Sequence, residues 1–277
     1  MIDKKKLERR FSRNAKTYDT YASVQKIMSK KLMNLIKIDH PIKILEIGCG
    51  TGYLTNLLVH SFPNAHITAV DLASGMIDVA SQRMKNNGVD NQVTFVCADI
   101  ETHFPTDNFD LIISNATFQW FNHPDEMANK IFTHLSPGGQ CLFSTFGNNT
   151  FNELAESFQL ASLEMELEDR VKPSQDFLSA YEWVLRLENA KNNSEVRAAV
   201  TSYETMLPEY FEDCMAFFKS IKKIGANKAS GSRPAQSPKF MKMVTDIYER
   251  EFMTPRGVCA TYHALYLSVE VISDRFL

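Results

Sequence analysis

The chain has 277 residues and a formal net charge of −3, which suits one large α/β domain and by itself predicts no nucleic-acid or membrane partner. No apolar run reaches the roughly 18 residues of a membrane span, and no hydrophobic signal-peptide core follows the N-terminal lysines, so we expect a cytoplasmic protein. Its five cysteines are scattered without a Cys-x-x-Cys pair, and no histidines cluster at ligand spacing, so we expect neither a disulfide framework nor a metal site.

Strands and helices are predicted to alternate along the first half of the chain. Two amphipathic patterns come first and predict helices at residues 4–16 and 21–37. Apolar runs predict five strands, at residues 42–47, 66–70, 93–97, 109–114 and 140–145. The helices between them are expected at residues 53–62, 76–86 and 124–135, with Ser74 as a cap and Pro137-Gly138-Gly139 as the turn into the fifth strand. This alternation is the signature of a doubly wound parallel sheet.

The second half of the chain is less regular. Helices are expected near residues 150–168, 174–187, 209–224 and 238–252. Two further strands, at residues 196–206 and 260–271, would complete a seven-stranded, mostly parallel, Rossmann-like sheet. Residues 225–237, rich in Gly, Ser, Pro and Lys, are the best candidate for a mobile loop.

A glycine-rich turn follows the first predicted strand, in the sequence Glu46-Ile47-Gly48-Cys49-Gly50-Thr51-Gly52. Glycines remove the Cβ atoms from one patch of backbone, so a ligand can lie against the main chain and face the amides that begin the next helix. A dinucleotide-binding turn would have a small residue where this chain has Tyr53, which argues against a nicotinamide cofactor. The spacing instead resembles motif I of class I S-adenosylmethionine-dependent methyltransferases. A tight turn without a ligand is the alternative.

Polar side chains end the next three predicted strands. They are Asp71, Asp99 and Asn115, and ligands of such sheets bind outside the carboxyl ends of the strands. Asp71 can accept both ribose hydroxyls of an adenosine, and Asp99 can accept an adenine amino hydrogen while Ile100 covers the ring. Asn115 is expected beneath the sulfonium and amino-acid end. Each residue alone could instead cap a helix or a turn.

The resemblance to class I methyltransferases covers about residues 37–145. It implies S-adenosyl-L-methionine as the cofactor and S-adenosyl-L-homocysteine as its product. It further implies cofactor contacts at Glu46, Gly48, Cys49, Gly50, Gly52, Asp71, Leu72, Met76, Asp99, Ile100, Asn115 and Ala116.

The segment that ends in Gln119 and Trp120 indicates the acceptor. The Gln amide beside the indole N–H offers two neutral donors, which suit an oxyanion without giving it a full counter-charge. A carboxylate acceptor has a reference pKa of about 4 and is already ionised at neutral pH. Methyl transfer to it therefore needs alignment and no general base. A polar helix start with a core indole is the alternative for these two residues.

Five further blocks of sequence narrow the family. They are Phe11–Asp19, Ile113–Trp120, Phe143–Gly147 with Thr150-Phe151, Ile221–Ala226 and Ala260–Leu265. In this order, over almost the whole chain, they resemble the malonyl-[acyl-carrier protein] O-methyltransferase family of biotin synthesis. The resemblance implies methylation of the free carboxyl group of a malonyl thioester, which masks its charge so that fatty-acid enzymes can elongate it toward pimeloyl. The nearest alternative is a carboxyl methyltransferase for a small free polycarboxylate such as aconitate, and a non-catalytic cofactor-binding module is a third.

The family resemblance also implies site residues and a partner. Tyr18 is expected on an N-terminal lid, with its hydroxyl at the amino-acid end of the cofactor, although it could be a plain core aromatic. With Gln119 and Trp120 it completes the catalytic candidates. Acyl-carrier proteins are small and acidic, so the basic runs 4–16 and 219–242 become docking candidates. The docking residues proposed most specifically are Lys219, Lys222, Lys223, Lys228 and Arg233.

We expect one methyltransferase domain over residues 1–277. It would consist of a helical lid at 1–37, a cofactor-binding core at 38–146, and the remaining sheet with a helical acceptor and carrier-protein region at 147–277. The cation that would bind the malonyl group stays open among Arg9, Arg13, Arg256 and His263.

Overall fold

The computed structural model describes residues 1–167, 176–224 and 237–272. The chain forms two compact units. The first consists of Met1–Thr145, Leu178–Glu204 and Leu265–Leu277, and the second of Phe146–Phe177 and Thr205–Ala264. The division into a lid, a cofactor-binding core and a C-terminal region of one domain stays a prediction. Of the loop predicted at 225–237, residues 225–236 lie outside the described part of the chain.

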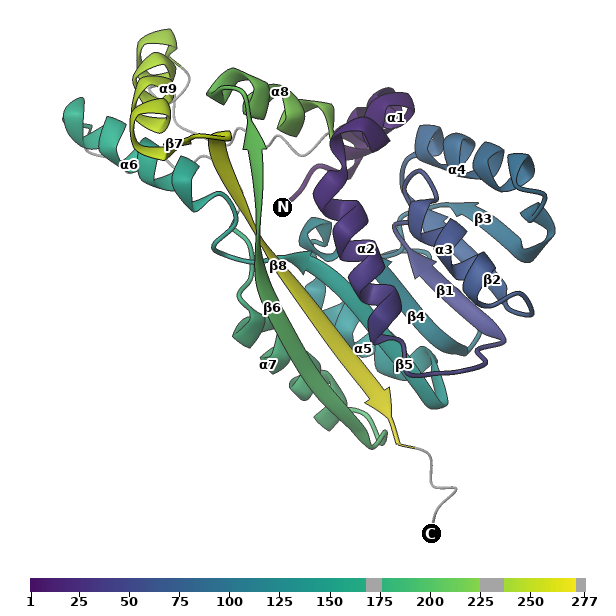
Figure 1. Cartoon of the computed structure of the whole chain (residues 1–277). Coiled ribbons are helices and arrows are strands. Elements are labelled where there is room, and N and C mark those ends of the chain that lie inside the picture. The colour runs from purple at the N-terminus through teal and green to yellow at the C-terminus, as the bar shows by residue number, and fades with distance from the viewer. Residues whose placement is uncertain (168–175, 225–236, 273–277) are drawn as a thin grey trace. The chain divides into compact units, whose positions relative to one another are not determined.

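The strands form one sheet in the order β3-β2-β1-β4-β5-β8-β6 (Figure 1). Their bounds are β1 Lys43–Ile47, β2 His66–Asp71, β3 Val93–Cys97, β4 Phe109–Asn115, β5 Leu135–Phe146, β6 Ala198–Phe211 and β8 Gly257–Val271. β1 pairs in parallel with β2 and β4, β2 with β3, and β4 with β5. The two-residue β7, Met253–Thr254, pairs antiparallel with β8. The predicted seven-stranded, mostly parallel, Rossmann-like sheet is confirmed, and β7 adds a short eighth strand within the described residues.

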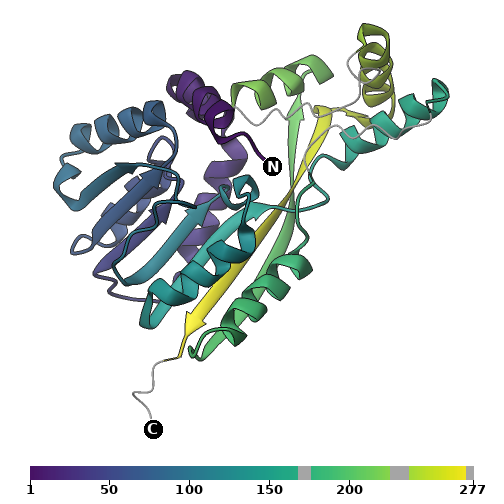
Figure 2. The same ribbon diagram turned by 180° about the vertical axis from the view of Figure 1, so that it is seen from behind.

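Helices of the first unit cover both faces of its part of the sheet. They are α1 Lys4–Tyr21, α2 Ser23–Leu35, α3 Tyr53–Ser61, α4 Ser74–Asn86, α5 Pro124–His134 and α7 Ala180–Asn192, with the short 3-10 helices η1 Asp90–Gln92 and η2 Phe118–Trp120. α2 and α3 lie on one face, and α5 and α7 lie on the other (Figures 1 and 2). Within the described part of the chain, no helix combines the length and apolar character needed to cross a membrane.

The core of the first unit lies between the sheet and the helices α5 and α7. Phe118 of η2 stacks on Phe143 of β5 with 3.8 Å between ring centroids, and its ring meets that of Trp183 of α7 at 5.7 Å. Burying such a ring contributes about 1.5–3 kcal/mol. Phe118 therefore anchors η2 and fixes the position of the backbone that carries the next two residues, Gln119 and Trp120.

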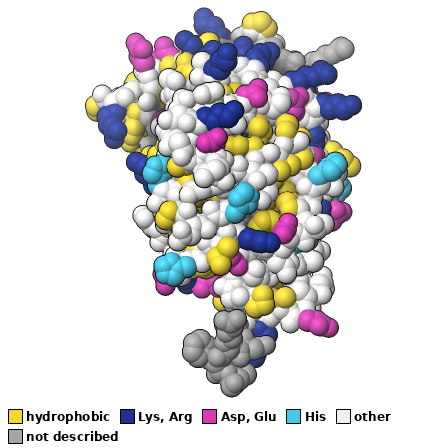
Figure 3. Space-filling view, turned by 90° about the vertical axis from the view of Figure 1, so that its right-hand side faces the viewer, with side chains coloured by type: hydrophobic (Ala, Val, Ile, Leu, Met, Phe, Trp, Pro, Cys, Tyr) yellow, Lys and Arg dark blue, Asp and Glu magenta, His cyan; other side chains and the backbone are white. Residues whose placement is uncertain are grey.

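The N-terminal helix α1 packs against α4 and has two different faces. Asp3 caps its start by accepting a hydrogen bond from the Lys6 amide at 3.0 Å. The exposed basic residues of α1 are Lys5, Lys6, Arg9, Arg13 and Lys16. Figure 3 shows Lys and Arg side chains gathered toward the upper end of the face in view. The opposite side of α1 faces the interior of the unit through Leu7 and Ala15.

Two helices begin later than predicted because polar side chains cap them. α7 begins at Ala180, since Ser179 accepts from the Glu182 amide at 3.3 Å and the Glu182 carboxylate accepts from the Ser179 amide at 2.8 Å. The expected start at Ser174 lies outside the described residues. α8 begins at Cys214, because β6 continues to Phe211 and Asp213 then accepts from the Ala216 amide at 2.7 Å.

Two predicted turn features are wrong. Ser74 is the first residue of α4 and makes no capping bond, because the Met76 and Ile77 amides donate to the Ala73 carbonyl instead, at 3.0 Å and 3.2 Å. Residues 137–139 do not precede the fifth strand but lie inside β5, which begins at Leu135. Its register with β4 shifts there, since the partner of Phe109 is Leu135 and the partner of Leu111 is Gln140. Residues 137–139 therefore form a bulge-like irregularity within the strand and not a turn before it.

The second unit contains α6 Asn152–Glu164, α8 Cys214–Lys223 and α9 Pro238–Phe252, together with the nearby parts of β6 and β8. α6 packs on α9 through Phe158 and Phe240, whose ring centroids are 5.5 Å apart. Glu153 of α6 accepts a hydrogen bond from the Thr261 amide of β8 at 3.1 Å. Ser237 caps α9 by accepting from the Phe240 amide at 3.1 Å. The expected end of α6 at residue 168 lies outside the described residues.

Candidate functional site

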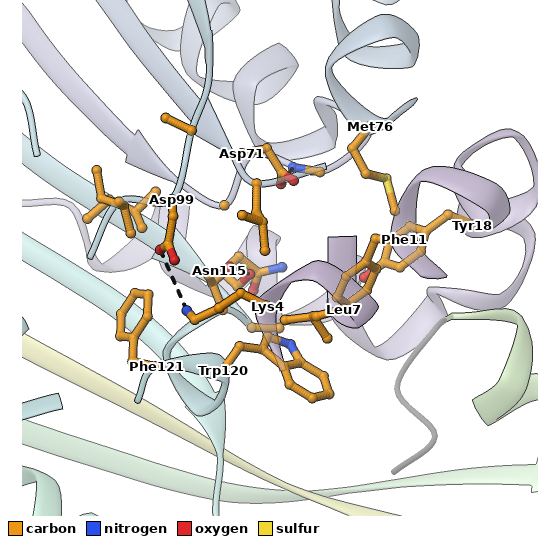
Figure 4. Close-up of a pocket in the computed structure, with 18 residues that line it drawn as sticks. Lys4, Leu7, Phe11, Tyr18, Asp71, Met76, Asp99, Asn115, Trp120 and Phe121 are labelled. Carbon is orange, nitrogen blue, oxygen red and sulfur yellow. Dashed lines mark hydrogen bonds and ion pairs between the residues drawn. The ribbon is translucent and has the colours of Figure 1, made fainter. Parts of the chain in front are cut away.

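A pocket opens in the first unit at the carboxyl ends of β1, β2, β3 and β4, beneath α1 (Figure 4). This is where a doubly wound sheet binds its ligands. Residues predicted from the sequence that line it are Tyr18, Gly48, Gly50, Asp71, Leu72, Met76, Asp99, Ile100, Asn115, Ala116 and Trp120. The lining residues that the sequence did not single out are Lys4, Leu7, Phe11, Ile47, Ala98, Thr117 and Phe121.

The glycine turn forms one wall of the pocket. Gly48, Gly50 and Gly52 have φ angles of 71°, 55° and 76°, which side chains rarely adopt. A Cβ atom on Gly48 would lie 2.0 Å from Oγ1 of Thr117. One on Gly50 would meet nothing within 4 Å among the described residues, because this glycine borders the open pocket. The turn thus keeps a strip of bare backbone beside the pocket.

Asp71 is held by the turn that it supports. Its Oδ2 accepts from the Gly50 amide at 2.8 Å and its Oδ1 accepts from the Ala73 amide at 2.8 Å. Burial raises the pKa of Asp71 to about 6, although these two hydrogen bonds act in the opposite direction. Each carboxylate oxygen has a second lone pair, so the ionised group can still accept two hydroxyl donors.

A lysine from α1 reaches Asp99 at the other end of the pocket (Figure 4). The Lys4 Nζ lies 3.6 Å from the Asp99 Oδ1, pairs closely with Glu101, and stands 5.5 Å from the centre of the Phe121 ring. Lys4 belongs to the N-terminal basic run that was considered only as a docking surface. Its spacing from Leu7, Phe11 and Tyr18 is helical and was the available signal that these residues share one face of α1.

Asn115 and Ala116 form the floor of the pocket. The Asn115 amide group donates to the carbonyl of Gln25 at 3.0 Å and accepts from the Ser144 hydroxyl at 2.7 Å, so its orientation is set by both neighbours. Ala116 has a φ of 52°, an uncommon value for a residue with a Cβ. Its amide donates to the Ser144 carbonyl at 2.9 Å, which ties the turn to β5.

Gln119 and Trp120, although adjacent in the sequence, have different positions relative to the pocket. Trp120 lines the pocket and its ring meets that of Phe11 edge-on at 5.8 Å. Gln119 lies outside the set of lining residues. Its Nε2 donates to the Ala116 carbonyl at 2.7 Å and its Oε1 accepts from the Thr145 hydroxyl at 2.9 Å. In this geometry Gln119 stabilises the turn at Ala116. The sequence had led us to expect its amide as a donor at the pocket mouth.

A second, smaller pocket adjoins the first and takes in Glu46 and Cys49. Glu46 accepts from the Thr55 hydroxyl at 2.6 Å, and burial raises its pKa to about 8, so it is largely protonated at neutral pH. Burial also raises the pKa of the Cys49 thiol, which keeps it unreactive. Gly52 lines neither pocket and instead lies close to α4, where its Cβ would be 3.0 Å from that of Ala80.

Tyr18 borders both pockets. Its pKa is raised, first by burial and then by the negative charges of Asp71 and Asp19, so its hydroxyl stays protonated and can donate. Asp19 is fixed in turn by the Thr51 hydroxyl at 2.6 Å and by an ion pair with Arg83. The C-terminal end of α1 is thereby attached to the glycine turn.

The candidate malonyl-binding cations stay unassigned. Arg9 and Arg13 are exposed on α1, and none of the four candidates lines either pocket. In the second unit, Arg256 lies over the Tyr210 ring at 3.9 Å, and His263 is 3% exposed.

Comparison with known proteins identifies the family to which this chain is similar. Residues 44–139 match the family model described as a methyltransferase domain. The malonyl-[acyl-carrier protein] O-methyltransferase of Priestia megaterium is 42% identical over 273 residues, covering 97% of this chain and 98% of that protein. The enzymes of the same name from Bacillus cytotoxicus and Acetivibrio thermocellus are 43% and 40% identical, covering 98% and 97% of this chain and 93% and 94% of theirs.

The chain belongs to the malonyl-[acyl-carrier protein] O-methyltransferase family. It is therefore an O-methyltransferase, as the sequence predicted.

Solved structures agree with the fold of this family member. The YcgJ protein of Bacillus subtilis superposes with a TM-score of 0.61 at 15% identity, covering 90% of this chain and 99% of that one. Phosphoethanolamine N-methyltransferase 2 of Haemonchus contortus, crystallised with S-adenosyl-L-methionine, superposes with a TM-score of 0.55 at 17% identity, covering 95% of this chain and 57% of that one. At such identities the likeness shows the fold alone.

Proposed function

We propose that this protein transfers the methyl group of S-adenosyl-L-methionine to the free carboxylate of malonyl-[acyl-carrier protein]. The observation that carries the proposal is the end-to-end similarity to enzymes with that name, which extends over 97% and 98% of this chain in two of them. The methyl ester masks the charge of the malonyl end, and we propose that this prepares the acyl group for elongation toward pimeloyl in the cytoplasm.

The pocket fits an adenosyl cofactor. Its bare glycine wall accepts a ligand that a Cβ would exclude, and polar groups stand at both ends of an otherwise apolar cavity. We assign the ribose hydroxyls to Asp71 and the adenine amino group to Asp99, with Ile100 against the ring. The amino-acid end is assigned to the Gly48–Gly50 backbone, to Asn115 and to the Tyr18 hydroxyl. These assignments follow the order of the strands and the hydrogen bonds still open to each side chain.

The residues beside the amino-acid end suit a reaction without a general base. Bound S-adenosyl-L-methionine supplies an electrophilic methyl group on a positively charged sulfur. Attack by a carboxylate cancels both charges, so a pocket that excludes water favours the transition state over the ground state. Phe11 and Trp120 supply such a wall, while Tyr18 and Glu46 stay protonated and Cys49 stays a thiol. We propose that Trp120 helps to align the acceptor and that Gln119 holds the turn on which that alignment depends.

Docking of the carrier protein is proposed on electrostatic grounds. Lys219, Lys222 and Lys223 lie on α8 of the second unit, and Lys219 and Lys222 are exposed. Lys228 and Arg233 lie outside the described residues. An acidic carrier protein would be attracted to this basic helix.

Mass spectrometry of malonyl-carrier protein tests the reaction directly. The purified protein, S-adenosyl-L-methionine and malonyl-carrier protein should yield a product heavier by one methylene group, and the gain should disappear when acetyl-carrier protein, which lacks the free carboxyl, is used. Parallel reactions with free malonate and aconitate test the rival function. Equal turnover of those acids would contradict the carrier-protein assignment, and binding of the cofactor without transfer to any carboxylate would indicate a non-catalytic role.

A further inference from the structure

The segment that begins α1 is fastened across one end of the pocket by backbone and side-chain bonds. The Ile2 amide donates to Oδ1 of Asn122 at 2.6 Å, and Nδ2 of Asn122 donates back to the Ile2 carbonyl at 3.0 Å. Asn122 follows η2 and Phe121, and is thus attached to the floor of the pocket rather than to α1. These two bonds join positions 120 residues apart in the sequence.

Lys4 makes the next attachment, and it lies inside the pocket. Its ammonium group stands between the carboxylates of Asp99 and Glu101 and over the Phe121 ring, as Figure 4 shows for Asp99 and Phe121. The Lys4 side chain is 20% exposed, so its charge is substantially removed from water. A cation in this position needs a carboxylate partner whether or not the pocket holds a ligand.

The two carboxylates are unequal partners. The Glu101 side chain is 6% exposed against 23% for Asp99. The Oε1 of Glu101 also accepts from the backbone amides of Asn122 at 2.9 Å and His123 at 2.7 Å. Although burial opposes it, the hydrogen bonds from Lys4, His123 and Asn122 hold the pKa of Glu101 below its usual range. Glu101 is therefore a fixed anion. Asp99 engages Lys4 more loosely, at 3.6 Å, and its Oδ1 also accepts from the Glu101 amide at 3.1 Å.

We infer that Lys4, held by Glu101, is a positioning residue of the cofactor site: the pair fastens the first turn of α1 over the adenosyl end of the pocket and leaves the second carboxylate oxygen of Asp99, Oδ2, to bind the adenine. The inference rests on the proposed cofactor. Its consequence is kinetic. Release of S-adenosyl-L-homocysteine requires the Lys4–Glu101 pair and the Ile2–Asn122 bonds to open, so these contacts set the residence time of the product.

Burial distinguishes this pair from an ordinary surface salt bridge. Exposed ion pairs contribute little because water and salt screen them. A buried carboxylate that loses its only cationic partner is a different case, since its desolvation is no longer compensated. Removal of Lys4 would leave the Glu101 carboxylate, among the described residues, with only the two loop amides, and α1 would be held at the adenosyl end by the Ile2–Asn122 bonds alone.

Binding of S-adenosyl-L-homocysteine to purified variants tests the inference. Lys4→Met removes the charge and keeps most of the length, Lys4→Arg keeps the charge, and Asn122→Ala removes the Ile2 bonds from the other side. Lys5→Met is the matched control, because Lys5 is adjacent, exposed and makes no ion pair among the described residues. Titration calorimetry gives the dissociation constant, and stopped-flow fluorescence of Trp120, whose ring contacts Phe11 of α1, gives the release rate.

Lys4→Met should raise the dissociation constant about tenfold, the effect of losing a hydrogen bond to a charged group, mostly through faster release. Asn122→Ala should act in the same direction, and Lys4→Arg and Lys5→Met should behave as the wild type. Wild-type affinity in Lys4→Met, or equal weakening in Lys5→Met, overturns the inference, and Asn122→Ala decides the matter if Lys4→Met does not fold. A wild-type protein that does not bind S-adenosyl-L-homocysteine would instead overturn the proposed cofactor.

Discussion

At the scale of single residues, the ionisation of Asp71 is the feature with the clearest consequence for binding. The carboxyl group is buried beside the glycine turn, and its pKa is raised from 3.8 to about 6. The ionised form is the better acceptor for two ribose hydroxyls. Affinity and stability of the unliganded protein should therefore depend on pH in opposite directions near this value.

We predict that S-adenosyl-L-homocysteine binds more weakly as the pH falls through about 6, by up to about tenfold per pH unit once Asp71 is protonated. Because the folded-state pKa is raised, ionisation of Asp71 destabilises the unliganded fold above about pH 6, and this penalty is relieved as the pH falls through that value. Calorimetric titrations of the wild type and Asp71→Asn over this range measure the effect. A pH dependence that is the same in both proteins would exclude Asp71 as its source.

Gln119 carries a second prediction at this scale. Gln119→Leu removes the bonds to the Ala116 carbonyl and the Thr145 hydroxyl, so the Ala116 turn should loosen. We expect kcat to fall roughly tenfold, the effect of losing one or two hydrogen bonds at the site, with little change in the affinity for S-adenosyl-L-homocysteine. Thr145→Val, which removes only one of the bonds, should have a smaller effect. Unchanged turnover in Gln119→Leu would remove this residue from the site.

At the scale of elements, the close packing of α1 on α4 determines how α1 covers the pocket. A Cβ on Gly75 of α4 would lie 2.6 Å from the carbonyl oxygen of Ser12 of α1, and the Gly75 amide is 3.2 Å from the Ser12 hydroxyl. Only glycine allows the two helices to approach this closely. The same helix α1 presents Leu7, Phe11 and Tyr18 to the pocket.

We predict that Gly75→Ala pushes α1 outward and weakens binding of S-adenosyl-L-homocysteine roughly tenfold, while the core fold survives the about 1–3 kcal/mol of overpacking. Calorimetry and thermal unfolding measure the two effects separately. Ser74→Ala is the control, because Ser74 is exposed and makes no capping bond. Wild-type affinity in Gly75→Ala would show that the position of α1 does not control access to the pocket.

At the scale of the whole molecule, the proposed docking of an acidic carrier protein depends on how positive charge is distributed. The formal net charge is −3, so attraction must come from local basic groups and should be sensitive to salt. Lys222 and Lys223 close the last turn of α8.

We predict that changing Lys222 and Lys223 together to Glu raises the Michaelis constant for malonyl-carrier protein several-fold, with kcat little changed, and that added salt has the same effect on the wild type. Lys85→Glu, a charge reversal in the last turn of α4, controls for the loss of a favourable helix-dipole interaction. An unaltered constant in the double variant would place the docking surface elsewhere.

Features that depend on interactions between residues close in the sequence were predicted correctly, and features that depend on distant residues were not. The amino-acid sequence by itself determined the order of strands and helices, the glycine turn and the carboxylates at the strand ends, because hydrophobic periodicity and glycine spacing act over a few residues and parallel strands bring their carboxyl ends to one edge. The predicted cap at Ser74 was wrong because the Ala73 carbonyl accepts the amides that Ser74 would cap. The predicted start of β5 was wrong because a register shift includes residues 137–139 in the strand.

Only the tertiary structure decided that Lys4 enters the pocket beside Asp99 and that the Gln119 amide faces Ala116 and Thr145. Lys4 is one of seven cations in a short basic run, and its helical spacing from Leu7 and Phe11 places it on their face of α1 without showing what that face meets. Its role comes from Glu101 and Phe121, about a hundred positions away, which meet it only after the sheet and α1 have packed. The physical reason is that a polar side chain satisfies its hydrogen bonds with whichever partners folding brings within about 3 Å.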